Sequence, residues 1–214
     1  MSLPRIAPYD PLDASSLPLN RVNWAVDPGK AALLIHDMQN YFLRAFAPGG
    51  PVASAVANIQ RLATASRAAG IPVVYTAQPA RQEAASRGLL MDFWGPGPGG
   101  QLDDDRIVAP LAPAPGEAVV TKHRYSAFHD TGLSEVLAAH GRDQLLITGV
   151  YAHLGCMLTA VDAFARGVQA FLVADAVADF DRDRHHQALR YVAESCGMVT
   201  VTDEVLGSAT RSRR

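Results

Sequence analysis

The chain has 214 residues, 49% of them hydrophobic and 19% charged, and its 19 basic and 21 acidic residues leave a net charge of −2. This composition is typical of one globular domain with a sizeable core and excludes a largely disordered chain. The small net charge excludes an electrostatic field that would recruit nucleic acid or an anionic membrane. Two cysteines are too few for a disulfide framework and indicate a reducing compartment.

The first residues of the given sequence are not expected to form a secretory signal. The first residues lack the basic and then apolar segments of a secretory signal, and no apolar run approaches the roughly 20 residues that span a bilayer. We therefore expect a cytoplasmic protein in which residues 1–214 form a single domain. The basic ending, residues 211–214, is interpreted as a solvated tail.

In chain order, the first predicted element is a buried strand over residues 31–36, because a short apolar run is typical of the interior of a parallel sheet. A helix is predicted over residues 51–69, where apolar residues recur at helical spacing between Pro51 and Gly70. A second strand is predicted over residues 71–76.

Residues 78–115 interrupt this alternation with a segment rich in Gly and Pro. A plain surface connection is one interpretation, but a connection this long in a compact domain is often a lid or a binding loop. The bulky residues Phe93 and Trp94 favour a lid. The pattern alone leaves both interpretations open.

The remaining elements again alternate short apolar runs with amphipathic segments. Strands are predicted over residues 118–121, 144–148, 168–174 and 198–202, and helices over residues 131–140, 155–166 and 182–196. Strands that alternate with helices form βαβ units. The sequence therefore predicts an α/β fold, a Rossmann-like open parallel sheet of about six strands that helices cover.

Polar residues follow several predicted strands, at the edge of a parallel sheet where ligands bind. Asp37 follows the first predicted strand and Gln78 the second. Lys122 follows the third, and residues 149–151 follow the fourth. Each alone has an ordinary explanation, such as a turn cap or a solvated strand end. Together, a carboxyl group, an amide and an ammonium group predict a general acid or base with a charged partner.

Longer motifs resemble the isochorismatase-like hydrolases and, among them, the true isochorismatases. They are Ile-His-Asp-Met-Gln-Asn-Tyr-Phe from residue 35, Tyr-Thr-Ala-Gln-Pro from 75, Asp-Phe-Trp-Gly-Pro-Gly from 92, Arg-Tyr-Ser-Ala-Phe from 124, Thr-Gly-Val-Tyr-Ala-His-Leu-Gly-Cys-Met from 148 and Val-Ala-Asp-Ala from 173. The resemblance covers nearly the whole chain. It implies helices on both faces of the sheet and a homodimer. Some bifunctional relatives continue into a C-terminal carrier domain, and we expect none in this chain.

The resemblance implies hydrolysis of an enol-pyruvyl ether to pyruvate and a cyclohexadiene carboxylate, in siderophore or phenazine pathways. Asp37 matches the general acid and Lys122 its charged partner. Gly155, without a side chain, leaves room where related cysteine hydrolases hold their nucleophile. The other matches are substrate-binding positions at Gln78, Arg87 and Tyr151 and pocket walls at Phe42, Trp94 and Tyr125.

The substrate stays open between isochorismate and 2-amino-2-deoxyisochorismate, with residues 155–157 favouring isochorismate. His123 stands where relatives often carry Trp, which leaves the pocket edge undefined. We expect Asp37 to be ionised in the free enzyme because of Lys122, and to gain its proton when a dianionic substrate neutralises Lys122 and Arg87.

Two alternatives remain. A cysteine-dependent amidohydrolase of the nicotinamidase type would use Cys156, but this residue lies one position beyond the expected nucleophile, which turns a helical side chain by about 100°. We therefore interpret Cys156 as a packing residue. An inactive binding module is the second alternative, and the acid together with two cations argues against it. No cofactor and no metal are expected, since the adjacent His185 and His186 diverge on a helix.

Overall fold

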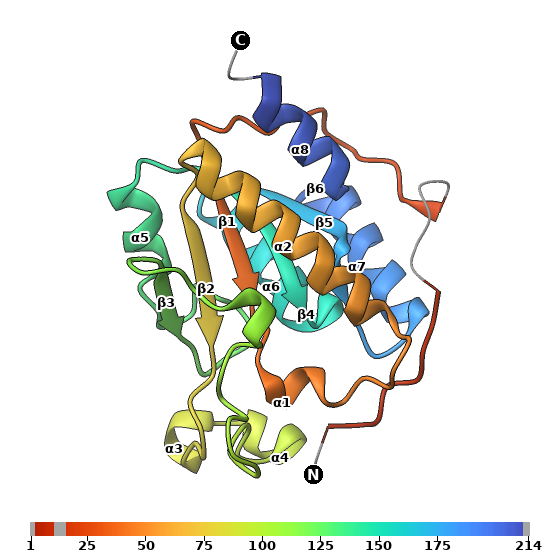
Figure 1. Ribbon diagram of the computed structural model, residues 1–214, viewed down its shortest axis with the longest axis vertical. Helices are drawn as coiled ribbons and strands as arrows, with labels where there is room; N and C mark the ends of the chain where they lie inside the picture. Colours follow the sequence, from red (N-terminus) through yellow and green to blue (C-terminus); the bar gives the residue numbers. More distant parts are fainter. Residues whose placement is uncertain (1–2, 11–15, 212–214) are drawn as a thin grey trace.

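The computed structural model describes residues 3–10 and 16–211, so most of the predicted tail lies outside the described residues. Its strands are β1 (Ala31–His36), β2 (Val73–Ala77), β3 (Ala118–Thr121), β4 (Gln144–Val150), β5 (Gln169–Ala178) and β6 (Gly197–Thr200). They form one parallel sheet in the order β3-β2-β1-β4-β5-β6 (Figure 1). The predicted α/β fold with about six strands is confirmed.

The helices flank this sheet and its carboxyl edge. They are α1 (Asn40–Leu43), α2 (Pro51–Ala69), α3 (Ala84–Arg87), α4 (Leu90–Trp94), α5 (Leu133–Ala139), α6 (Met157–Ala165), α7 (Arg182–Ser195) and α8 (Thr202–Arg211). A short 3₁₀ turn (Ala109–Leu111) precedes β3 and a π-helical turn (Ala152–Cys156) precedes α6. The helix predicted from residue 155 therefore begins at Ala152, and its first turn is π-helical and not α-helical. The strand predicted over residues 198–202 ends at Thr200, because Thr202 already begins α8.

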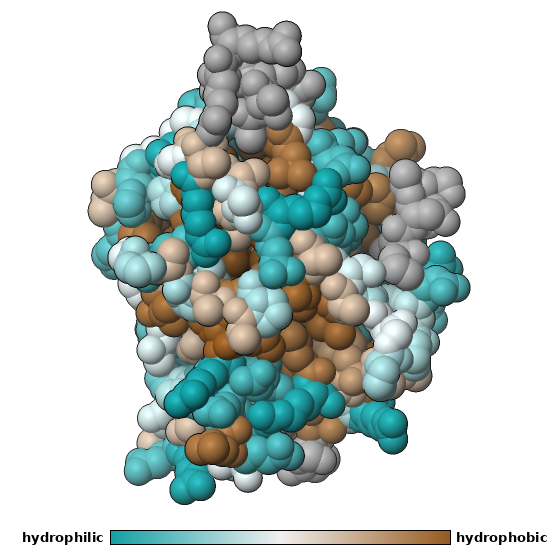
Figure 2. Space-filling view, in the orientation of Figure 1, coloured by the Kyte–Doolittle hydropathy of each residue, from teal (hydrophilic) through white to brown (hydrophobic). Residues whose placement is uncertain are grey.

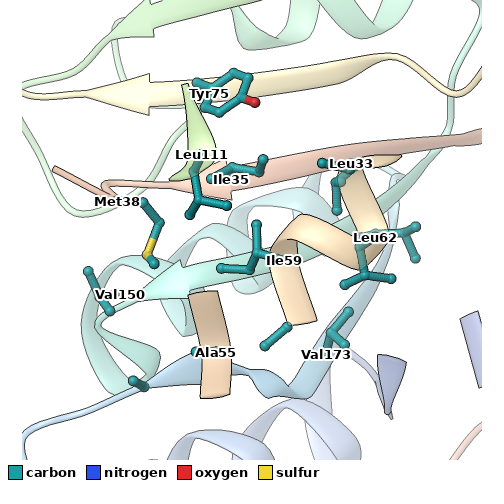
Figure 3. Close-up of a cluster of buried hydrophobic side chains, with 14 of the residues drawn as sticks. Leu33, Ile35, Met38, Ala55, Ile59, Leu62, Tyr75, Leu111, Val150 and Val173 are labelled. Carbon is teal, nitrogen blue, oxygen red and sulfur yellow. The ribbon is translucent and has the colours of Figure 1, made fainter. Parts of the chain in front are cut away.

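Successive side chains of a strand point to opposite faces of the sheet, and both faces of β1 are buried. Leu33 and Ile35 pack with Ile59 of α2 on one face (Figure 3), and Leu34 packs with Leu189 of α7 on the other. Helices α2 and α8 lie against the first face and α5, α6 and α7 against the second (Figure 1). Helices on both faces are therefore confirmed.

The strand order reverses direction between β1 and β4, which makes this pair the topological switch point, where open α/β sheets bind ligands. The two backbones approach closely here, because Gly149 pairs with His36. A Cβ on Gly149 would lie 2.1 Å from the His36 carbonyl oxygen, and its φ of +109° is one that only glycine adopts readily. All strands point toward the end of the molecule that holds α1, α3 and α4 (Figure 1).

Residues 78–115 fold over this end of the sheet and contain α3 and α4. Two backbone hydrogen bonds, Arg81 N–H to the Pro98 carbonyl at 2.7 Å and Gln82 N–H to the Pro96 carbonyl at 3.1 Å, hold the segment together. Trp94 faces inward, as the lid interpretation expects. Phe93 is 65% exposed, so its side chain does not favour that interpretation. On the face seen in Figure 2, this end is mostly hydrophilic, below a more hydrophobic band. No described helix is long and apolar enough to cross a bilayer.

Candidate active site

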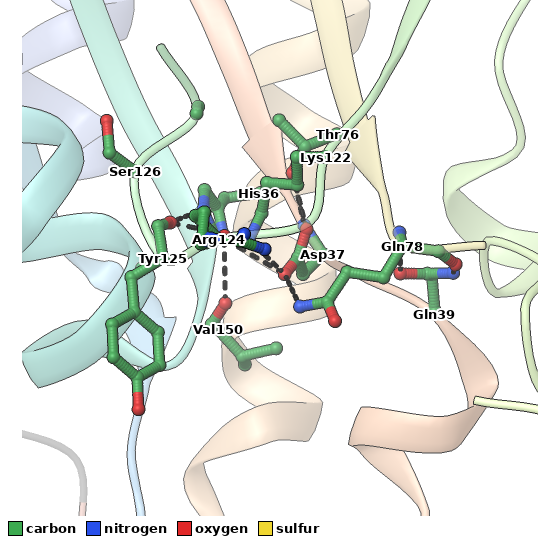
Figure 4. Close-up of polar contacts among 12 residues, drawn as sticks. His36, Asp37, Gln39, Thr76, Gln78, Lys122, Arg124, Tyr125, Ser126 and Val150 are labelled. Carbon is green, nitrogen blue, oxygen red and sulfur yellow. Dashed lines mark hydrogen bonds and ion pairs between the residues drawn. The ribbon is translucent and has the colours of Figure 1, made fainter. Parts of the chain in front are cut away.

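Asp37 follows β1 and stands at the centre of the polar contacts at the switch point (Figure 4). Its φ of 50° lies in the left-handed region, which is uncommon for a residue other than glycine. The Asp37 N–H donates to the Thr76 hydroxyl at 3.0 Å, so β2 stabilises this turn. The residue is only 3% exposed. A strand end and a specific turn thus hold one buried carboxyl group.

Three donors contact the Asp37 carboxyl group. The Thr76 hydroxyl donates to Oδ1 at 2.6 Å and the Gln78 amide donates to Oδ2 at 2.9 Å. The Lys122 ammonium group lies 2.9 Å from the same Oδ2. Three predicted strand-end residues therefore meet at one carboxyl group, and Thr76, which the sequence interpretation did not assign, completes the set.

Lys122 is 1% exposed and is the charged partner of Asp37. Its ammonium group also donates to the carbonyl oxygens of Arg124 at 2.7 Å and Tyr125 at 3.3 Å. An ammonium group has three donors, and all three are used. Full pairing is what allows this charge to be buried, since an unpaired buried charge is strongly destabilising.

Burial raises the pKa of Asp37, but the Lys122 charge, His36 and the Thr76 hydroxyl together hold this pKa below its usual range. The carboxyl group is therefore ionised at neutral pH in the free protein. This direction supports the expectation of an ionised Asp37. A general acid at this position consequently needs a change in its surroundings before it can hold a proton.

Arg87 lies in α3, within the segment 78–115, and its side chain is buried. Its Nη1 donates to Gln78 Oε1 and its Nε donates to the Gly95 carbonyl at 2.9 Å. Gln78 thus connects a guanidinium group to the Asp37 carboxyl group through the two ends of one amide. A carboxylate that reaches Arg87 therefore lies one side chain away from Asp37.

A pocket opens at this place, and charged, polar and aromatic side chains line it. All nine residues predicted for the site line it, and they are Asp37, Phe42, Gln78, Arg87, Trp94, Lys122, Tyr125, Tyr151 and Gly155. Their roles remain predictions. The lining also includes residues that the sequence interpretation did not assign, namely Leu3, His36, Tyr41, Leu90, Val150 and Leu154. A histidine within a buried, otherwise apolar strand was the one signal for His36.

Aromatic side chains form much of the pocket wall. The Trp94 indole N–H donates to the Tyr125 hydroxyl at 2.7 Å and so ties α4 to the segment after β3. The Tyr151 hydroxyl donates to the Phe42 carbonyl at 2.9 Å, and burial raises the pKa of Tyr151 well above its usual value. Tyr151 therefore contributes a neutral ring. His123 lies outside the pocket lining and contacts Gln82 Oε1 at 2.7 Å through Nδ1.

Two expectations about cysteine and glycine have different outcomes. Cys156 is fully buried, lies outside the pocket lining and packs in the core with α6 and α7. Burial raises the pKa of its thiol well above the usual value, which supports a packing role and not a nucleophile. The space expected in front of Gly155 is not open, because the His36 ring fills it. Among the described residues, no three His, Cys, Asp or Glu side chains gather as a metal site.

A Rossmann-type sheet with a buried acid–lysine pair and a pocket at its switch point defines an α/β enzyme domain that acts on a small molecule. The sequence matches the isochorismatase domain over residues 31–204. The chain belongs to the isochorismatase family of hydrolases.

The chain is 50% identical to the isochorismatase of Bacillus subtilis over 96% of its own length and 66% of that protein's length. It is 47% identical to phenazine biosynthesis protein PhzD of Pseudomonas fluorescens, over 95% of this chain and 98% of the relative. The crystal structure of a cysteine hydrolase from Pseudomonas syringae has the same fold, with a TM-score of 0.80, 26% identity and coverage of 91% and 98% of the two chains. The chain thus spans about two thirds of one relative and nearly all of another.

Proposed function

We propose that this enzyme hydrolyses the enol-pyruvyl ether of isochorismate, with Asp37 as the general acid. The products are pyruvate and 2,3-dihydro-2,3-dihydroxybenzoate. The observation that carries the proposal is the buried Asp37 carboxyl group on the pocket wall, paired with Lys122 and joined through Gln78 to Arg87. The pocket thus brings together a carboxyl group that can act as an acid and two cationic side chains that favour an anionic substrate.

The chemistry requires a proton donor in contact with carbon. The methylene carbon of the enol-pyruvyl group takes the proton from the Asp37 carboxyl group, and the double-bond electrons form the new C–H bond. The resulting oxocarbenium ion is captured by water, whose proton returns to Asp37. The hemiketal hydroxyl then passes its proton to the ring oxygen as the bond between that oxygen and the hemiketal carbon breaks, which releases pyruvate and the ring alcohol. The enzyme ends each cycle with its original protonation state.

The substrate itself resolves the low pKa of Asp37. One substrate carboxylate binds Arg87, and the negative charge of the substrate offsets the positive field that holds Asp37 ionised, while Lys122 keeps its three partners. Exclusion of water from the pocket then leaves burial as the main influence on Asp37, and burial favours the protonated form. Gln78 keeps the acid in position, because it contacts both Asp37 and Arg87.

The charges of the pocket favour isochorismate over its amino analogue. Among the described residues that line the pocket, Asp37 is the single carboxylate, and it is already paired with Lys122. The ammonium group of 2-amino-2-deoxyisochorismate would lie near Lys122 and Arg87 with no unpaired protein carboxylate to compensate its charge. A ring hydroxyl needs no such partner, so the lining supports isochorismate as substrate.

The test is pyruvate release from both compounds, measured as kcat/KM under the same conditions. We expect isochorismate to be preferred by roughly tenfold or more, the scale of one uncompensated charge contact. A tenfold preference for the amino compound would contradict the substrate assignment but retain the reaction. No pyruvate from either compound would contradict the proposed reaction and favour a binding module.

A further inference from the structure

Position 155 faces the imidazole ring of His36. A Cβ on Gly155 would lie 2.0 Å from Cε1 and 2.6 Å from Nε2 of His36, far inside van der Waals contact. The φ of Gly155 lies outside the left-handed region, so its backbone conformation is open to any residue. The His36 ring, rather than the backbone, therefore restricts position 155 to glycine.

The ring of His36 faces two backbone carbonyl oxygens, and because burial lowers its pKa the neutral ring donates its single N–H to one of them and packs against the other. Its Nδ1 lies 2.9 Å from the Val150 carbonyl oxygen and its Nε2 lies 3.3 Å from the Tyr125 carbonyl oxygen (Figure 4). His36 is 1% exposed. The ring thus fills the gap between the end of β4, the π-helical turn that contains Gly155, and the peptide of Tyr125.

The Tyr125 carbonyl connects this ring to the reacting groups. The same oxygen accepts a hydrogen bond from the Lys122 ammonium group at 3.3 Å, and that ammonium group contacts Asp37 Oδ2 at 2.9 Å. A shift of the Tyr125 peptide into the space of a missing ring would move one of the three acceptors of Lys122. The position of His36 and the position of the charged partner of Asp37 are therefore coupled.

We infer that His36 is a positioning residue for the ether hydrolysis proposed above. Its ring occupies the volume of a side chain at position 155, and it braces the Tyr125 carbonyl that orients Lys122 against Asp37. One consequence concerns the related cysteine hydrolases. A cysteine introduced at position 155 alone has no room for its Cβ, so a single substitution does not create a working nucleophile in this chain.

The test combines Gly155→Ala, His36→Asn and the double variant. Asn retains an N–H near the place of Nδ1, opposite Val150, but vacates the place of Cε1 and Nε2. Gly207→Ala is the matched control, because a Cβ there meets no atom within 4 Å. We expect Gly155→Ala to lower the urea midpoint of unfolding strongly and the control not to lower it, since Ala favours helix α8 over Gly. Addition of His36→Asn is expected to restore most of the loss.

Kinetics separate positioning from packing. In His36→Asn we expect kcat on isochorismate to fall about tenfold or more, since misplacement by about 1 Å can cost 100-fold, with KM within about twofold because Arg87 and Gln78 do not contact the ring. His36→Gln, whose amide reaches toward the place of Nε2, is expected to recover part of kcat. The double variant regains stability without regaining kcat.

Two results would overturn the inference. One is an equal loss of stability from Gly155→Ala with and without His36. The other is a wild-type kcat in the folded His36→Asn enzyme. The unfolding measurements need no substrate, so a wild-type enzyme that releases no pyruvate would refute the proposed reaction separately, while the coupling of His36 and Gly155 would still be measured.

Discussion

Lys122→Met removes the ammonium group that compensates the buried charge of Asp37 and retains most of the volume of the lysine stem. The lysine side chain is 1% exposed, and its Nζ lies 2.9 Å from Asp37 Oδ2. Removal of one partner from a buried ion pair costs about 3–5 kcal/mol of unfolding free energy when the other stays charged. The loss of the two carbonyl contacts of Lys122 adds a cost that does not depend on pH.

The pH dependence has a definite sign. In the wild type the folded pKa of Asp37 is depressed, so its contribution to stability is present above the unfolded pKa of about 3.9 and is lost as pH falls through the folded pKa. In the variant, burial without Lys122 raises the folded pKa above 3.9. The stability of the variant therefore falls as pH rises through and above that value. The deficit relative to the wild type therefore grows as pH rises above about 4 and approaches about 3–5 kcal/mol at neutral pH.

Urea unfolding of both proteins between pH 4.5 and 8 measures this deficit. Lys30→Met is the control, because Lys30 is exposed, and we expect its deficit to be small at every pH. The other titrating groups are common to the proteins compared, and the one neighbour that also responds is His36, whose pKa the Lys122 charge helps to lower, so the difference reports Asp37 together with His36. A Lys122→Met deficit that stays constant, or that shrinks as pH rises, would refute the account of a compensated buried carboxylate.

Three further predictions concern the chemistry. Cys156→Ala is expected to leave kcat within a few fold, because the thiol is buried outside the pocket; a covalent adduct on Cys156 during turnover would contradict this. Dialysis against EDTA is expected to leave kcat unchanged, since the proton comes from Asp37, and a loss that zinc restores would defeat the metal-free prediction. Binding of a non-hydrolysable dicarboxylate analogue is expected to make the enzyme take up one proton, at Asp37. Calorimetry in two buffers of different ionisation enthalpy measures this uptake, and equal heats of binding in both buffers would contradict substrate-assisted protonation.

The sequence predicted the sheet well because its strands are short, continuous apolar runs. Helix α2 was predicted with its observed bounds, since Pro51 and Gly70 mark its two ends. The sequence pattern does not predict helix α8, because the apolar run of residues 198–202 fits a strand, although Asp203 and Glu204 provide the acidic first turn of a helix. Local patterns therefore identify an element more reliably than its ends.

The site was predictable to the extent that it depends on strand ends. Asp37, Gln78 and Lys122 converge because parallel strands end at one edge of a sheet. Arg87 came from the family resemblance alone, since no periodicity reveals the path of residues 78–115. The contact between His36 and Gly155 joins β1 to the turn after β4, and no sequence pattern encodes such a distance. Homodimer assembly and cytoplasmic location stay predictions.

The most direct test of the proposed function is the kcat of Asp37→Asn for pyruvate formation from isochorismate. Asn retains the size of Asp37 but has no acidic proton, and its single acceptor oxygen replaces only one of the two oxygens to which Thr76 and Gln78 donate. We expect kcat to fall by about 10²–10⁴, the usual contribution of a general acid, while a substrate analogue still binds because one negative charge has left the pocket. A folded Asp37→Asn enzyme that binds the analogue and keeps a near-normal kcat would contradict the assignment of Asp37 as the acid.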